Sequence, residues 1–171
     1  RGVGGHGSQP QSAKDPIVLA AQIILNLQTI VSREIHPLDL AVLTVGSIHG
    51  GSKHNIIPDD VHLQLTLRSY SSEVREHLIA SIKRICRGQA EAAGVPKDRF
   101  PVVKVKDEFT PATYHDPDLV KRVTGVLADW FGKGALVERK PTMGGEDFGR
   151  YGTTKHKIPV FMFRLGSVSP A

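Results

Sequence analysis

Three short stretches of this sequence carry side chains that could hold a small substrate. His6 is a lone imidazole in the run Gly4–Gly7, where glycines let a backbone approach a ligand closely. Asn55 lies in an Asn-Ile-Ile-Pro turn, and Arg68 follows thirteen residues later at the end of a strand-like segment. An amide offers a neutral donor and acceptor, whereas a guanidinium can take a carboxylate through two hydrogen bonds. Taken singly, each feature is also typical of an ordinary turn residue or a solvated charge.

The third stretch, Gly144-Gly145-Glu146-Asp147, is a glycine-rich turn with two carboxylates at an expected helix start. Acidic residues also favour a helix N-terminus simply because of the helix dipole. Other chemistries find less support. His49, His54 and His62 have spacings that match no usual metal-ligand pattern. The sequence contains neither a Gly-x-Ser-x-Gly nucleophile elbow nor a phosphate-binding P-loop, and Cys86 falls on the apolar side of a predicted helix.

The elements that must position these residues begin with a helix. Asp15 and Pro16 are an N-cap acceptor and a proline at the first helical position, and Pro37 ends the segment. The apolar residues that recur at helical spacing and predict its buried face are Ile17, Ala20, Ala21, Ile24, Leu27, Ile30 and Val31. Residues 41–48 are apolar and β-prone. Residues 61–68 alternate between apolar and polar side chains, which predicts a strand with one face in a core.

A second helix follows, with Ser71 or Ser72 as its N-cap and Gly94 just beyond its end. Residues 102–106 predict one more strand, so the order of elements from Asp15 is α-β-β-α-β. A ferredoxin-like split sheet needs a further strand in front of the first helix, and Arg1–Gly4 would be the end of that strand. We therefore expect an α+β domain with βαββαβ topology over residues 1–110.

Residues 111–171 have a different pattern, typical of an α/β domain. A helix is predicted from Asp116-Pro117 to Gly132, followed by a short strand over Ala135–Arg139. Ile158–Leu165 is an apolar run without alternation, which predicts a strand buried on both faces. So few residues cannot close an α/β domain, so we expect this segment to be an incomplete one.

Composition limits the classes of partner. Hydrophobic residues make up 40% of the chain and charged residues 23%, values typical of a globular protein with a core. The net charge is +5, but the basic residues are scattered without interleaved aromatics, so we expect no nucleic-acid partner. No unbroken apolar run approaches the ~20 residues that span a bilayer, so we expect no membrane partner. A single cysteine, Cys86, permits no internal disulfide and leaves the cellular compartment open.

Six motifs in order and spacing resemble one family, the zinc-peptidase-like amidohydrolases, which include hippurate hydrolases, N-acyl-amino-acid amidohydrolases and auxin-conjugate hydrolases. They are Gly-Gly-His6-Gly with Pro10, the Asp15-Pro16 helix start, Gly46-Ser-Ile-His49-Gly-Gly, Asn55-Ile-Ile-Pro58, Arg68, and Met143-Gly-Gly-Glu-Asp-Phe148. The resemblance covers nearly the whole chain. It implies a ferredoxin-like lid or dimerisation domain, followed by the C-terminal segment of an α/β catalytic domain.

The resemblance also implies a function and roles for named residues. His6 would act catalytically, reaching into a partner subunit to steady the oxyanion of the tetrahedral intermediate. Asn55 would hold the substrate near the scissile amide, Arg68 would bind its free carboxylate, and Gly144, Gly145 and Glu146 would line the pocket. The whole enzyme would be a homodimer that cleaves N-acyl-amino acids or similar amides with two divalent metal ions (Zn, Mn or Co).

None of the family's metal ligands falls within these 171 residues. The resemblance thus implies an internal piece of the enzyme, which binds no catalytic metal and is inactive alone. The alternative from another class is a non-catalytic dimerisation or binding module of ferredoxin-like fold. An RNA-binding domain of that fold would need exposed aromatic residues on the sheet, where residues 61–68 instead place His, Gln, Thr and Arg.

Overall fold

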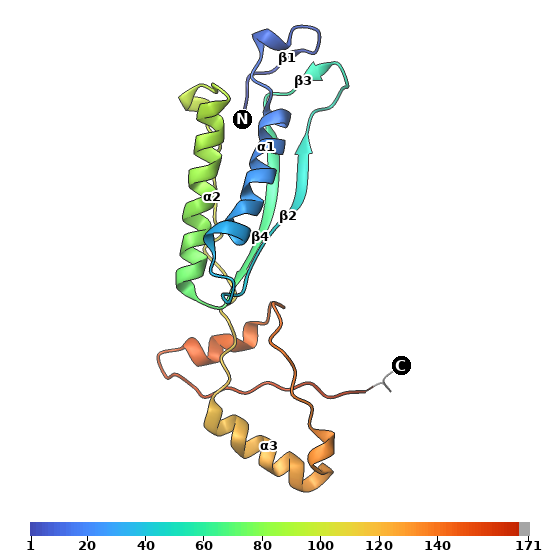
Figure 1. Cartoon of the computed structure of the whole chain (residues 1–171), viewed down its shortest axis with the longest axis vertical. Coiled ribbons are helices and arrows are strands. Elements are labelled where there is room, and N and C mark those ends of the chain that lie inside the picture. The colour runs from blue at the N-terminus through green and yellow to red at the C-terminus, as the bar shows by residue number, and fades with distance from the viewer. Residues whose placement is uncertain (168–171) are drawn as a thin grey trace. The chain divides into compact units, whose positions relative to one another are not determined.

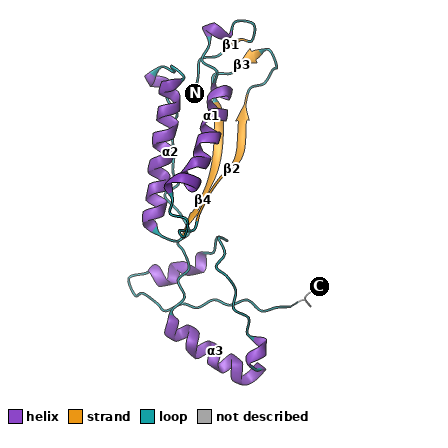
Figure 2. Cartoon of the chain, viewed as in Figure 1, coloured by secondary structure: helices purple, strands orange, loops and turns teal. Residues whose placement is uncertain are grey.

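The structure is a computed structural model that describes residues 1–167. The chain divides into two compact units, residues 1–106 (unit 1) and residues 107–171 (unit 2). Unit 1 holds all the strands of the described chain (Figure 2). In chain order its elements are β1 (Gly5–His6), α1 (Pro16–Thr29), β2 (Ala41–Gly50), β3 (Ile56–Ile57), β4 (Val61–Ser69) and α2 (Ser72–Ala92). The helix of unit 2 is α3 (Pro117–Phe131).

Unit 1 has two layers, with α1 and α2 side by side against a long antiparallel hairpin of β2 and β4 (Figure 1). Pairing runs from Ala41 opposite Ser69 to Gly50 opposite Val61, with a bulge at Gly46. Beyond the connected end of this hairpin, in the segment that joins β2 to β4, β3 pairs with β1 as a second, two-residue antiparallel ladder. This arrangement agrees with the expected α+β lid class, with helices on one face of a sheet.

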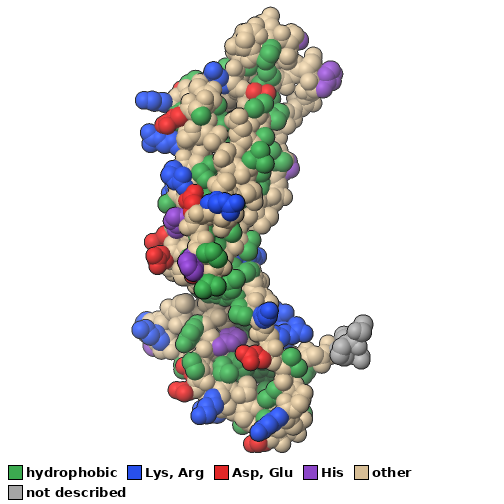
Figure 3. Space-filling view, in the orientation of Figure 1, with side chains coloured by type: hydrophobic (Ala, Val, Ile, Leu, Met, Phe, Trp, Pro, Cys, Tyr) green, Lys and Arg blue, Asp and Glu red, His purple; other side chains and the backbone are tan. Residues whose placement is uncertain are grey.

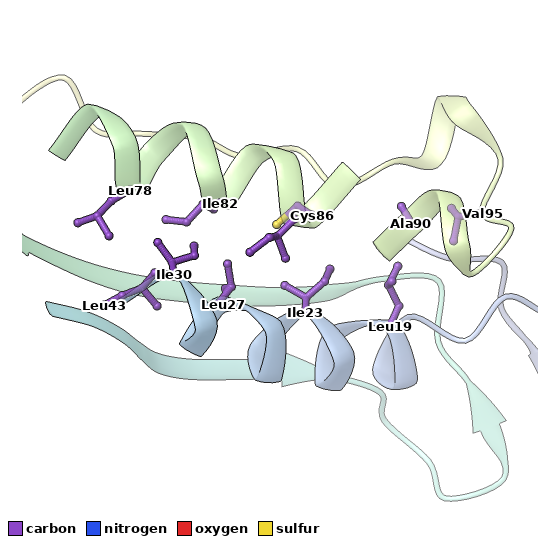
Figure 4. Close-up of a cluster of buried hydrophobic side chains, with 11 residues drawn as sticks. Leu19, Ile23, Leu27, Ile30, Leu43, Leu78, Ile82, Cys86, Ala90 and Val95 are labelled. Carbon is purple, nitrogen blue, oxygen red and sulfur yellow. The ribbon is translucent and has the colours of Figure 1, made fainter. Parts of the chain in front are cut away.

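The core of unit 1 lies between the two helices and the hairpin (Figure 4). Leu27 of α1, Ile30 just beyond it and Leu78 of α2 are its most completely buried large side chains. Leu63, Leu65 and Leu67 pack against this cluster from β4, which confirms the face predicted from their alternation. Cys86 lies in the same cluster, where burial raises the pKa of its thiol, as expected for a core residue rather than a nucleophile.

The predicted inward face of α1 was partly wrong. Leu19 and Ile23 are buried in place of Ile17 and Ile24, and Ile17 is 43% exposed. The helix is apolar on several sides, so its sequence alone does not determine which side faces the sheet. Ile30 continues the buried stripe of Leu19, Ile23 and Leu27 at helical spacing, and residues 30–34 then form a π-helical turn.

The expectation about long apolar runs also needs correction. Pro16–Glu34 is 19 residues long with a mean hydropathy of 1.3, which by length and composition is sufficient to cross a membrane. Isolated polar residues such as Gln22, Asn26 and Gln28 break the run without lowering its average much. In the structure, the buried side of this helix forms part of the core of unit 1.

The predicted strand at residues 102–106 is absent, and Arg1–Gly4 does not extend a central strand. A strand requires a hydrogen-bonded neighbour. Among residues 1–167, β4 pairs only with β2, and the first residues instead bond to loops: Gly2 N donates to Asp59 O, and Val3 bridges to Lys14. Val103 still packs against the core, so the segment keeps an inward residue without forming a ladder.

In unit 2, α3 begins and ends as predicted, with the Asp116 carboxylate accepting from Leu119 N and Gly132 at its end. The two strands predicted after it are not formed. The first segment begins in a 3-10 turn, Lys133–Ala135, and Val137 is 78% exposed. Within residues 158–165, Val160 is buried but Leu165 is 87% exposed, because no neighbouring strand or second layer covers it in the described chain.

Candidate functional site

The predicted residue His6 lies in β1, which pairs with β3 at one end of unit 1 (Figure 1). His6 pairs with Ile56, and the next residue, Gly7, donates its N–H to the carbonyl of Asn55 at 2.8 Å. A Cβ on Gly7 would lie 3.0 Å from that same carbonyl oxygen, so the close approach favours glycine. The structure therefore brings His6 and Asn55 together, although 48 residues separate them in the chain.

An ion pair holds together the two segments next to the β1–β3 pair. The Asp59 carboxylate accepts from Gly4 N and from Arg99, both at 3.2 Å, and Arg99 also donates to the carbonyl of Gly2 at 2.6 Å. The Gly4 N–H first, and then Arg99, hold the pKa of Asp59 below its usual value. Sequence reasoning did not single out these residues. The only local signal was the Pro58-Asp59 turn, and its partner Arg99 lies 40 residues away.

Among residues 1–167, the His6 side chain forms hydrogen bonds only within its own turn. Its Nδ1 lies 2.7 Å from the hydroxyl oxygen of Ser8 and accepts from the Ser8 backbone N–H at 3.2 Å. The carbonyl of His6 accepts from Gln9 N at 2.9 Å, which closes the turn. No hydrogen bond within residues 1–167 engages Nε2, and the residue is exposed. The free nitrogen of the ring is thus available to a group from outside the chain.

Arg68 lies near the far end of β4, opposite Val42. Its side chain is half-buried on the polar face of the strand, and no hydrogen bond or ion pair within the described residues engages its guanidinium. The seven steps from one residue to the next between Val61 and Arg68 span about 24 Å, at about 3.4 Å each. His6 and Asn55 lie at the opposite end of this strand, so the structure does not bring Arg68 to them within one chain.

The acidic turn lies in unit 2. Glu146 caps a 3-10 helix, Asp147–Thr153, by accepting from Phe148 N at 3.2 Å, as expected for an acidic helix start. The left-handed glycines of residues 1–167 are Gly51, Gly94 and Gly132, so Gly144 and Gly145 do not owe their presence to a positive φ. A cavity of about 360 Å³ in the same unit is lined by other residues, including Tyr114 and Lys157.

Metal ions and nucleic acid would each require a particular grouping of side chains on the surface. In residues 1–167, no three His, Cys, Asp or Glu side chains gather into a group that could hold a metal ion. The residues present therefore do not fit the two ions that the resemblance implies, and we assign them no metal role. On the face shown in Figure 3, Lys and Arg side chains lie scattered rather than in one stripe.

A family model described as "Peptidase dimerisation domain" matches residues 1–93. The chain is 36% identical to the IAA-amino acid hydrolase ILR1-like 2 of Arabidopsis thaliana over 96% of its own length, and 36% identical to the hippurate hydrolase of Campylobacter jejuni over 86%. It spans only 36% and 38% of the lengths of these relatives.

Solved structures show the same similarity. The YXEP protein of Bacillus subtilis, described as a dinuclear metal binding peptidase from the M20 family, superposes with a TM-score of 0.59 at 25% identity. That match covers 85% of this chain and 35% of the relative. The matched model covers more than half of the residues, so the chain belongs to the M20 peptidase family and carries its dimerisation domain at residues 1–93.

Proposed function

We propose that this chain serves a homodimeric, metal-dependent amidohydrolase that cleaves N-acyl-amino acids or similar amides. Its relatives include proteins named hippurate hydrolase and IAA-amino acid hydrolase, which supports this class of substrate. Because the chain spans little more than a third of those relatives, the metal ions would be held by other parts of the complete enzyme. The described residues would bind and orient the substrate.

The observation that carries this proposal is the separation of His6 and Asn55 from Arg68. In an N-acyl-amino acid, the scissile carbonyl and the free carboxylate are only a few bonds apart. Residues about 24 Å apart along one strand cannot both contact such a molecule. If Arg68 holds the carboxylate, His6 and Asn55 of the same chain cannot reach the carbonyl, which supports a site shared across the dimer.

Arg68, His6 and Asn55 would then each have a role that follows from the chemistry of its side chain. The planar guanidinium of Arg68 matches a carboxylate and would fix the substrate in a geometry ready for attack. The free nitrogen of His6, from the partner, would donate to the oxyanion that develops on the carbonyl. Asn55 from the same partner would hold the amide, and Gly144, Gly145 and Glu146 would line the pocket.

Unit 1 has a surface through which such a dimer could form. One edge of β2 has no partner strand among residues 1–167, and α2 packs mainly against β4. The helix α1 exposes apolar side chains, among them Val18 at 54% and Leu25 at 71%. An open strand edge beside exposed apolar residues favours association. We expect a dimer at micromolar concentration, and sedimentation that gives a monomer well above that range would contradict the shared site.

Mixed dimers test the shared site directly. In the complete enzyme, His6→Ala and Arg68→Ala homodimers would each be impaired at both sites. A mixed dimer would hold one site with both residues intact, so random re-pairing would restore about a quarter of the wild-type activity. Two His6→Ala preparations mixed in the same way provide the control. No recovery in exchanged dimers would mean that His6 and Arg68 serve the same site from one chain, or none at all.

Single substitutions separate the two roles. Arg68→Ala should mainly raise KM for substrates with a free carboxylate, and should hardly affect their methyl esters, because a charge-assisted pair is lost. His6→Ala should mainly lower kcat, by about 10²-fold, because an oxyanion donor acts mostly in the transition state. An equal loss on acid and ester would show that Arg68 is not the carboxylate anchor.

The second candidate is a non-catalytic dimerisation module. The match of residues 1–93 to a dimerisation domain, together with the lack of a metal-binding group in residues 1–167, favours it as the alternative. This candidate predicts that His6→Ala and Arg68→Ala change activity less than about threefold, as is usual for surface residues. Steady-state kinetics of the complete enzyme therefore decides between the two.

A further inference from the structure

The turn that carries His6 determines which ring nitrogen bears the proton. Nδ1 faces the backbone N–H of Ser8, which can only donate, at 3.2 Å. A nitrogen that accepts a hydrogen bond carries no proton, so the neutral imidazole has its proton on Nε2. The Ser8 hydroxyl, 2.7 Å from the same Nδ1, can donate as well, because a hydroxyl rotates freely to suit its partner.

The backbone holds Ser8 in this position. His6 and Gln9 close the turn through a hydrogen bond from Gln9 N to His6 O, and Gly7 N is bonded to Asn55 O. Ser8 is the third residue of the turn, so its N–H and side chain point back to the imidazole of the first. This is the same local geometry by which Asn and Asp side chains accept from the backbone two residues on.

We propose that Ser8 is a positioning residue that holds His6 as the Nε2–H tautomer. The consequence rests on the function proposed above. An oxyanion needs a donor aimed at it, and a neutral imidazole has only one. If Nδ1 carried the proton, the exposed Nε2 would present a lone pair to the developing negative charge. Ser8 thus keeps the exposed nitrogen a donor while the other nitrogen is occupied within the turn.

Nitrogen-15 chemical shifts of histidine-labelled protein test the tautomer without any activity measurement. The 171-residue chain has eight histidines, and the His6 signals are identified by their loss in His6→Gln. At a pH where the ring is neutral, we expect an unprotonated Nδ1 and a protonated Nε2. The opposite pattern would overturn the inference whatever the enzyme does.

Substitutions test the role of Ser8. Ser8→Ala keeps the backbone donor and removes the hydroxyl, so it should shift the His6 signals towards a tautomer mixture and lower kcat about three- to tenfold with KM little changed. Ser8→Thr keeps a hydroxyl and should restore both. Ser12→Ala, an exposed serine nearby, is the matched control and should change neither. Unchanged shifts and kcat in Ser8→Ala would overturn the positioning role.

The two proposals can fail separately. If the shifts show the Nε2–H tautomer but His6→Ala leaves kcat unchanged, the proposed function fails and the tautomer assignment stands. If His6→Ala lowers kcat but the wild-type shifts show a protonated Nδ1, the catalytic role stands and the assignment to Ser8 fails.

Discussion

Units 1 and 2 contain similar helices but bury them differently. In unit 1, α1 and α2 each place five or more residues in the interior, against each other and the β2–β4 hairpin. In unit 2, α3 has a good cap at each end and an amphipathic sequence, yet none of its residues is fully buried. Local signals are therefore sufficient to form a helix, whereas burial requires an opposing layer. Only unit 1 has such a layer in the described chain.

The largest expected effect comes from opening the core of unit 1. Leu27 is 1% exposed, so Leu27→Ala should lower the free energy of unfolding by about 2–5 kcal/mol. Leu165 of unit 2 is 87% exposed, and Leu165→Ala should change the free energy of unfolding by less than about 0.5 kcal/mol. Urea denaturation followed by far-UV circular dichroism measures both. Similar losses at the two positions would mean that unit 2 has a core of its own.

A smaller effect is expected at the contact between the end of α1 and α2. The Glu34 carboxylate accepts from Arg84 at 2.6 Å and from the buried Ser81 hydroxyl at 2.7 Å, and His77 lies 3.3 Å away. The hydrogen bonds from Arg84 and then Ser81 hold the pKa of Glu34 below its ordinary value of 4.5. A lowered pKa in the folded state stabilises the fold above pH 4.5, and this stabilisation is lost as the pH falls through the lowered value.

Glu34→Gln tests this contact. The wild type should lose about 1 kcal/mol more than the variant when its unfolding free energy is measured at pH 6 and again at pH 3. Glu146→Gln is the matched control in unit 2, since that carboxylate only caps a short 3-10 turn. Parallel pH profiles of wild type and Glu34→Gln would show that the contact adds no stability.

The same contrast explains what sequence could predict about the fold. Helix ends at Asp15, Ser71, Gly94, Asp116 and Gly132 were predicted correctly, because caps and positive-φ glycines act within a few residues. The paired strands β2 and β4 were also predicted, β2 from an apolar, β-prone run and β4 from alternation, which marks a face that packs on a core. The strands expected at residues 102–106, 135–139 and 158–165 depended on neighbours that local sequence cannot supply.

For the candidate site, the residue types were readable from the sequence but their arrangement was not. That His6 lies beside Asn55 depends on the pairing of β1 with β3, and that Arg68 lies at the other end of unit 1 depends on the length and register of the β2–β4 hairpin. Ser8 was not singled out because a serine in a turn is common, and its significance appears only with the Nδ1 contact.

The smallest effect compares the two units at chemically matched positions. Gly94 ends α2 with φ +64°, and Gly132 ends α3 with φ +81°. A side chain at Gly94 would meet only the flexible end of Lys14, and one at Gly132 would meet nothing within 4 Å. Alanine at Gly94 therefore costs mainly the positive-φ backbone conformation, about 1 kcal/mol. At Gly132, where ψ is 149°, the backbone conformation is largely restricted to glycine, and alanine costs about 1–3 kcal/mol.

The two substitutions should differ in which part of the chain loses stability. Because α2 is part of the core of unit 1, Gly94→Ala should lower the global unfolding free energy by the full amount. Because α3 has no fully buried residue, Gly132→Ala should fray the end of that helix and leave the unfolding of unit 1 unchanged. Hydrogen exchange resolved along the chain distinguishes the two outcomes. Faster exchange throughout unit 1 in Gly132→Ala would show that the two units unfold as one, and the comparison between them would no longer hold.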